Sequence, residues 1–145
     1  MSKPCLFCRI AAGEEPGFIA YEDEQFAAFL DIRPLFHGHV LLVPKTHVEA
    51  VWDLPPELVG PLGERVQLLS VAVREAMGAK GIFNAVNNIV SQSVPHLHVH
   101  VVPRNPKDGL RGFFWPRTTY ADDAEAQAVA DRIRAAADAR AAAAG

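Results

Sequence analysis

The sequence has only two cysteines among its 145 residues, and it has neither a long apolar run nor a run of like charges. The close spacing of Cys5 and Cys8 favours metal binding or redox chemistry over a structural disulfide. No apolar stretch approaches the ~20 residues that a membrane span requires, and Met1–Cys5 lacks the apolar run of a signal peptide. We therefore expect a cytoplasmic protein with no membrane partner.

The charge balance argues against a broad nucleic-acid interface. The chain has 14 basic and 17 acidic residues, which give a net charge of -3 at pH 7. Because a phosphate-backbone footprint needs clustered basic residues, we do not expect nucleic acid as the main partner. Half of the residues are hydrophobic and 21% are charged, which is typical of one folded domain. We expect a single domain over residues 1–145 that needs no metal merely to fold.

Apolar spacing predicts an α+β domain with a mainly antiparallel five-stranded sheet, a long central helix and a C-terminal helix. The central helix carries one apolar stripe from Leu58 to Met77. Asp122, followed by Glu125, opens the C-terminal helix as a variant of the capping box. A further short helix is expected to end at Ala12, before Gly13. The expected strands are Phe18–Tyr21, Gln25–Leu30, Val40–Val43, Ile82–Asn87 and His96–Val102.

The six histidines are clustered rather than scattered. In the segment His96–Val101, three histidines alternate with three apolar residues. Because successive side chains of a strand point to opposite faces, the three imidazoles share one face. Three interpretations compete: a partly exposed polar face, a metal site, and phosphoryl chemistry in which one imidazole attacks phosphorus. The hydroxyl and amide groups of Ser91–Ser93, directly upstream, favour phosphoryl chemistry.

At this point the sequence resembles a known family. Residues 96–102 read H-L-H-V-H-V-V, which matches the signature of the histidine triad (HIT) superfamily of nucleotide-binding hydrolases and transferases. The resemblance covers about residues 5–104, is closest to the bacterial Hit and Hint-like branch, and leaves residues 105–145 as a C-terminal extension. It implies a HIT-like fold. Other motifs in family order are Phe7–Ile10, Tyr21–Asp23, Phe29–Ile32, Gly38–His39, Val43–His47, Gln92–Val94 and Pro103–Arg104.

The resemblance implies catalysis at the α-phosphate of a purine nucleotide without a catalytic metal. His98 would attack phosphorus and form a nucleotidyl-histidine intermediate, which water then hydrolyses. His100, Gln92 and Ser93 would contact the phosphate or the leaving group. Nucleoside phosphoramidates are the leading substrate class. The alternatives are hydrolysis or phosphorolysis of dinucleoside polyphosphates or adenylyl sulfate, and a non-catalytic regulatory module that binds nucleotides.

The resemblance also implies a nucleotide site. Asp31 would accept hydrogen bonds from the ribose hydroxyls, Ile32 would pack on the base, and Asn88 would reach the ribose or a phosphate. Asp31 and Asn88 could equally be turn residues. Ser91 stands where the family usually has glycine in a longer loop, a departure that bears on the backbone amide contacts to phosphate that glycine permits. The expected nucleotide-binding residues are Asp31, Ile32, Asn88, Ser91, Gln92, Ser93, His98 and His100.

A second implied site is a structural zinc site. Two thiolates and two imidazoles form the closed tetrahedral set that structural zinc prefers, and many Hit-branch proteins hold zinc in this way. The competing interpretation of the cysteine pair is a redox couple, although the preceding strand of a thioredoxin-like unit is missing. The expected ligands are Cys5, Cys8, His47 and His96.

The resemblance further implies a homodimer. Trp115-Pro116 resembles an element that reaches the partner subunit's site in Hint-type proteins, although a surface or core aromatic cluster is an equal alternative. His37 and His39 have no predicted chemical role.

Overall fold

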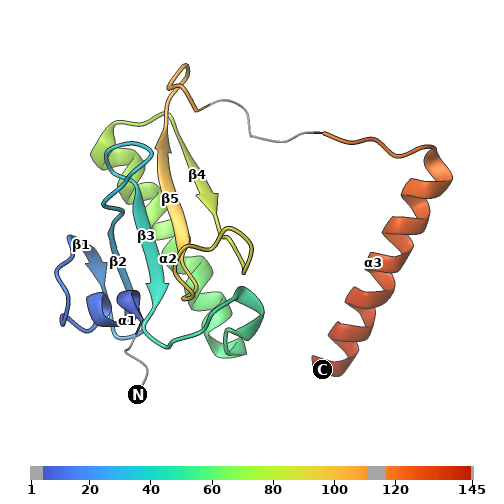
Figure 1. Ribbon diagram of the computed structural model, residues 1–145, viewed down its shortest axis with the longest axis horizontal. Helices are drawn as coiled ribbons and strands as arrows, with labels where there is room; N and C mark the ends of the chain where they lie inside the picture. The colour runs from blue at the N-terminus through green and yellow to red at the C-terminus, as the bar shows by residue number, and fades with distance from the viewer. Residues whose placement is uncertain (1–4, 111–116, 145) are drawn as a thin grey trace. The chain divides into compact units, whose positions relative to one another are not determined.

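The computed structural model describes residues 5–110 and 117–144, which form two compact units (Figure 1). One unit extends to Asp108 and the other begins at Gly109. Trp115 and Pro116 lie outside the described residues, so their expected role stays a prediction. The prediction of a single domain over residues 1–145 likewise stays a prediction.

The first unit is built on a five-stranded antiparallel sheet, which confirms the expected α+β class. The spatial order of the strands is β1-β2-β3-β5-β4. Val40, Leu41 and Leu42 of β3 pair with Val101, His100 and Val99 of β5, which places the histidine segment in the middle of the sheet. The strands are β1 (Ile19–Glu22), β2 (Phe26–Leu30), β3 (Val40–Pro44), β4 (Gly81–Ala85) and β5 (Val99–Arg104).

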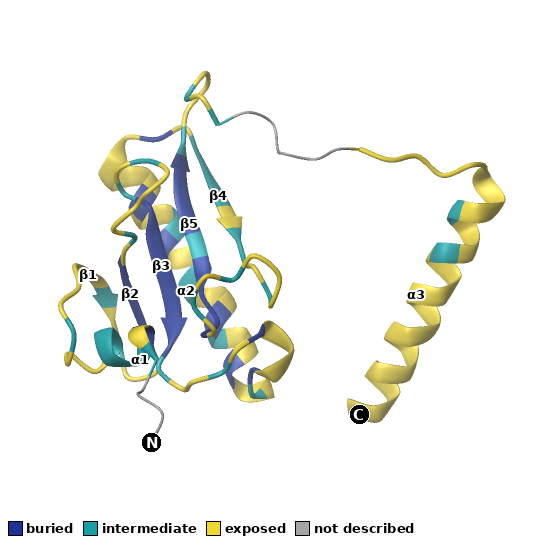
Figure 2. Ribbon diagram, in the orientation of Figure 1, coloured by how far each residue is buried: buried dark blue, intermediate teal, exposed yellow. Residues whose placement is uncertain are grey.

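The sheet has two apolar faces, each covered by a helix, because apolar residues occupy both alternating sets of positions in β2 and β3. The long helix α2 (Pro56–Met77) packs on one face, against Leu42, Val99 and Val101 among others. The short helix α1 (Leu6–Ala11) packs on the other, where its Phe7 contacts Phe29 edge to face. Figure 2 shows the buried residues concentrated along β2, β3 and β5.

Strand β5 begins at Val99, three residues later than expected from the sequence. The preceding residues bond to loops instead of to a strand: the Leu97 amide donates to the Val48 carbonyl at 2.7 Å. The reason lies in β3, which ends at Pro44, a residue with no N–H to continue the ladder. The alternation nevertheless persists, since Leu97 lies in the core beneath α2 together with Val99 and Val101.

The second unit contains α3 (Asp123–Ala144). The Asp122 carboxylate accepts the Glu125 amide at 2.8 Å, which confirms the expected helix start. Across the described part of the chain, no helix combines the length and the apolar character needed to cross a bilayer.

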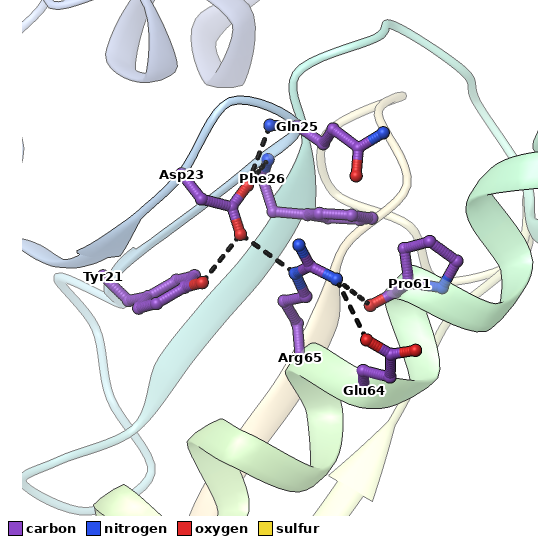
Figure 3. A network of polar contacts seen from close by, with 7 residues as sticks. All are labelled: Tyr21, Asp23, Gln25, Phe26, Pro61, Glu64 and Arg65. Atoms are coloured by element: carbon purple, nitrogen blue, oxygen red, sulfur yellow. Dashed lines mark hydrogen bonds and ion pairs between the residues drawn. The ribbon is translucent and has the colours of Figure 1, made fainter.

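A partly buried polar network joins the β1–β2 turn to α2 (Figure 3). The Asp23 carboxylate accepts hydrogen bonds from the Tyr21 hydroxyl at 2.7 Å, the Arg65 Nε at 2.9 Å, and the backbone amides of Gln25 and Phe26 at 2.8 Å. Burial alone would raise the pKa of Asp23, but these donors hold it well below its usual range. The network therefore fixes the acidic turn between β1 and β2.

We expect Asp23→Asn to lower the free energy of unfolding at pH 7 by about 1 to 3 kcal/mol, because it removes the charge that Arg65 and the amides stabilise. Chemical denaturation measures this change. Glu24→Gln is the matched control, since Glu24 is the exposed neighbouring carboxylate. An equal loss in both variants would contradict the role of the network.

Candidate active site and metal-ligand cluster

Four side chains from three parts of the chain meet at the N-terminus of α1. Cys5 caps this helix through a hydrogen bond from the Cys8 amide to its sulfur at 3.1 Å, and this turn brings the two sulfurs together. His47 follows β3, and His96 precedes β5. The Cys5 sulfur lies 3.4 and 3.2 Å from the Nδ1 atoms of His47 and His96, and the Cys8 sulfur lies 3.3 and 3.4 Å from the same atoms. The two Nδ1 atoms are 3.1 Å apart.

The donor set fits a tetrahedral zinc ion. Zinc–nitrogen and zinc–sulfur bonds of about 2.0 and 2.3 Å place ligand atoms about 3.3 to 3.8 Å apart at tetrahedral angles, close to the distances observed. The Nε2 of His96 lies 2.8 Å from the Pro44 carbonyl oxygen, which can only accept, so Nε2 carries the proton and Nδ1 the lone pair. The expected zinc ligands are thus brought together in a form compatible with zinc.

His98 lies on the α1 side of the sheet, and a hydrogen bond to the backbone fixes its tautomer. Its Nδ1 is 2.7 Å from the backbone carbonyl oxygen of His96. Because a carbonyl oxygen cannot donate, Nδ1 carries the proton and Nε2 has a free lone pair. The ring packs edge to face on Phe7, with 5.0 Å between centroids, and is 98% buried as a residue.

His39 makes a contact that the sequence did not predict. The Leu35 amide donates to the Nδ1 of His39 at 3.1 Å, so the proton of His39 sits on Nε2. That Nε2 lies 2.9 Å from the Nδ1 of His100 and donates to it. His100 therefore carries its proton on Nε2, as a hydrogen-bond donor. The only signal in the sequence was that Gly38-His39 belongs to the family pattern, since 61 residues separate the two rings.

Burial keeps these two rings neutral. It lowers the pKa of His39 and, with smaller contributions from His98 and His39, lowers the pKa of His100 to about 4. Asp31 opposes both shifts: its carboxylate is 3.7 Å from the Nε2 of His39. At neutral pH both rings are therefore neutral, and the hydrogen bond between them runs in one direction, from His39 to His100.

A pocket of about 320 Å³ opens beside the histidines. Five predicted site residues line it: Asp31, Ile32, Ser93, His98 and His100. The other lining residues are apolar or belong to the loop that follows α1: Leu6, Phe7, Ile10, Glu15, Pro16, Gly17, Phe29, Leu30, Leu41 and Val94.

The other predicted residues, Asn88, Ser91 and Gln92, are not among the residues that line this pocket. The side-chain oxygen of Asn88 accepts the Val51 amide at 2.7 Å. The Gln92 side chain donates to the Glu49 carbonyl at 2.7 Å and accepts the Ile89 amide at 3.1 Å. These two amides thus tie the loop before Ser93 to the segment that leads into α2.

Ser91 adopts a backbone conformation that glycine favours. Its φ is 62°, and that of Ile89 is 71°, both in the left-handed region that glycine enters most easily. The loop therefore keeps a glycine-like path without glycine.

Comparisons with known proteins show which family the chain belongs to. A match to the HIT domain family covers residues 12–107. The chain belongs to the HIT family.

Three named relatives resemble this HIT protein along most of its length. It is 40% identical over 122 residues to protein hit of Bacillus subtilis, an alignment that covers 82% of each chain. It is 37% identical over 112 residues to adenylylsulfatase HINT3 of Arabidopsis thaliana, covering 76% of this chain and 57% of that protein. It is 36% identical over 111 residues to adenosine 5'-monophosphoramidase HNT1 of Saccharomyces cerevisiae, covering 73% and 66%. The names of these relatives support a hydrolase of the nucleotide-binding kind.

Two solved structures confirm the HIT fold. A HIT family member from Bacillus subtilis superimposes with a TM-score of 0.80 at 38% identity, covering 91% of this chain and 96% of that one. A zinc-bound histidine triad protein from Mycobacterium smegmatis gives a TM-score of 0.70 at 41% identity, covering 78% and 84%.

The lowered pKa of His100 makes the stability of this HIT protein depend on pH. The ordinary value is 6.5 and the folded value about 4, so the contribution is complete above pH 6.5 and is lost as the pH falls toward 4. We expect His100→Asn to reduce the loss of unfolding free energy between pH 7 and pH 5 by about 2 kcal/mol. Denaturant titrations at both pH values measure it, with the exposed His37→Asn as control. The same pH dependence in all three proteins would contradict the prediction.

Proposed function

We propose that this HIT protein is a nucleotidyl hydrolase that acts on purine nucleoside phosphoramidates through a nucleotidyl intermediate on His98. The observation that carries the proposal is the tautomer of His98. Its Nδ1–H is held by the His96 carbonyl at 2.7 Å, which leaves the Nε2 lone pair of a pocket-lining imidazole available for attack.

The reaction then consists of two displacements. Nε2 of His98 attacks the α-phosphorus, the P–N bond to the leaving group breaks, and the departing nitrogen takes up a proton to leave as an amine. Water next attacks the same phosphorus, the P–Nε2 bond breaks, and a nucleoside monophosphate is released. The water supplies the proton that the amine removed, so the site returns to its starting state.

Two neighbours of His98 can donate hydrogen bonds to the phosphate or to the leaving group. His100 is 5.0 Å away between ring centroids and carries its proton on Nε2, which makes it a donor for a phosphate oxygen or the leaving group. Ser93 lines the same pocket and offers a hydroxyl that can donate to the departing nitrogen. Gln92 acts as a positioning residue, because its side-chain amide is bonded to the loop backbone.

The pocket also suits the nucleoside. Asp31 presents a carboxylate, an acceptor for the two ribose hydroxyls, while one of its oxygens is held by the Arg33 amide at 2.8 Å. Ile32 is 81% exposed and lines the pocket, which leaves its apolar side chain available to pack on a flat base. In this proposal Asp31 serves both as the turn residue and as the nucleoside ligand, which the sequence offered as alternatives.

Sulfate is the second leaving group to consider, because one relative is named as an adenylylsulfatase. The same attack by His98 on the α-phosphorus of adenylyl sulfate would expel sulfate instead of an amine. Parallel kinetics with adenosine phosphoramidate, adenylyl sulfate and diadenosine polyphosphates rank the leaving groups. Nucleotide binding without turnover of any of them would instead support a regulatory module.

Quenching the enzyme in alkali during turnover should trap a nucleotidyl adduct, and peptide mass spectrometry should place it on His98. His98→Gln should show no adduct and at least about a 10³-fold lower kcat, since the nucleophile itself is lost. The exposed His37→Gln is the matched histidine control and should keep wild-type turnover. An adduct elsewhere, or unchanged turnover in His98→Gln, would refute the covalent mechanism.

We further propose that Cys5, Cys8, His47 and His96 hold a structural zinc ion. The support is the mutual spacing of the four donor atoms, the proton of His96 fixed on Nε2 by the Pro44 carbonyl, and the zinc-bound relative. Zinc there would supply charge neutralisation for two thiolates and would join α1 to the ends of β3 and β5.

Protein purified without added metal should contain about one zinc ion per chain. Cys8→Ser should lose most of this zinc and lower the melting temperature, because α1 is no longer joined to the sheet by the ion. Elemental analysis and thermal denaturation, each before and after treatment with a chelator, make the measurement. Metal-free protein in which both thiols titrate freely, with no change in melting temperature, would refute the site.

The homodimer also stays a proposal. β4 forms one edge of the five-stranded sheet, so a second copy could extend the sheet there. The particle mass in solution tests it.

A further inference from the structure

We infer that Glu15 makes this HIT protein prefer guanine over adenine. The inference rests on the proposed function, since it assumes that the pocket beside His98 binds a purine nucleotide. It starts from one feature of that pocket: two carboxylates line it, Asp31 and Glu15, whereas most of the other walls are apolar.

The two carboxylates lie in different surroundings. Asp31 belongs with the histidines, because its carboxylate, His39 and His100 have their polar atoms within 4.8 Å of one another. Glu15 belongs to the loop after α1, and its carboxylate lies 3.6 Å from the Arg9 guanidinium on that helix. In the proposed function the phosphate binds at His98 and the ribose at Asp31, so the base takes the rest of the pocket, which apolar side chains and Glu15 line.

The loop that carries Glu15 is held firmly against α1. The amides of Gly13 and Glu14 donate to the carbonyls of Ile10 and Arg9, at 3.1 and 2.8 Å. Gly17 lies so close to the helix that a Cβ there would come within 2.7 Å of the Ile10 Cγ2. The backbone that carries Glu15 is therefore in place before a ligand binds, which favours selective recognition.

The ion pair with Arg9 leaves Glu15 able to bind a base. At 3.6 Å it is too long for a hydrogen bond, so it orients the carboxylate without using its acceptor sites fully. An ionised carboxylate only accepts hydrogen bonds, and it has two oxygens side by side. A matching ligand therefore needs two adjacent donors.

Guanine has such a pair and adenine does not. The N1–H and the 2-amino group of guanine point in the same direction and can both donate to one carboxylate. Adenine has an amino group beside N1, whose lone pair faces the same way and is repelled by the negative charge. Hypoxanthine has the N1–H alone. A bidentate contact of this kind typically discriminates between bases by about tenfold or more.

Calorimetric titration of the full-length protein with GMP, IMP and AMP tests the inference. The wild type should bind GMP about tenfold more tightly than AMP, with IMP between them. Glu15→Gln should bring GMP and AMP within about twofold, because an amide has only one acceptor oxygen. In Glu15→Asp the carboxylate keeps its charge but lies one methylene farther from the base. This variant should therefore bind GMP more weakly and AMP nearly as the wild type does.

Glu14→Gln is the matched control, since Glu14 is the exposed neighbour and does not line the pocket. It should keep the wild-type preference, and melting temperatures show that each variant is folded. Equal affinity of the wild type for GMP and AMP, or an unchanged preference in Glu15→Gln, would overturn the inference. These results distinguish the inference from the proposed function. Turnover of adenosine and guanosine phosphoramidates with no preference overturns only the inference about Glu15. A preference for GMP without turnover of any substrate overturns only the proposed hydrolase activity.

Discussion

The alternation of side chains over residues 96–101 is the constraint on which the rest of the site depends. Leu97, Val99 and Val101 point into the core beneath α2, and this burial fixes the register of the segment. The three histidines are therefore forced to the opposite face, where α1 lies. A shift of one residue would bury the imidazoles in an apolar core and expose the aliphatic side chains, so fold and chemistry specify the same register.

The same face connects the two sites of the molecule. His96 contributes its ring to the metal-ligand cluster and its carbonyl to the proton of His98. Helix α1 also contributes to both sites: Cys8 belongs to the metal-ligand cluster, and Phe7 and Ile10 line the pocket. The metal-ligand cluster, His98 and the pocket thus share one short helix and one stretch of backbone. A structural ion at this place would act on ligand binding through the position of α1 and on attack through the backbone of His96.

The sequence predicted the elements that follow from periodicity, and its failures have physical causes. The stripe of α2 and the faces of the histidine segment follow from spacing alone. The late start of β5 depends on Pro44 in another strand, where a missing N–H ends the ladder. The bond between His39 and His100 joins rings 61 residues apart. The amides of Asn88 and Gln92 bind a loop backbone, and no spacing along the chain shows where that backbone lies.

Main-chain groups, directly or through His39, fix the proton of His96, His98 and His100. The carbonyls of Pro44 and His96 and the amide of Leu35 set the tautomers of His96, His98 and, through His39, His100. Every amino acid has a carbonyl, and every one except proline has an amide hydrogen. Evolutionary drift in the side chains at positions 35 and 44 can therefore change the packing around the site without moving a proton, provided that the backbone keeps its path and position 35 does not become proline.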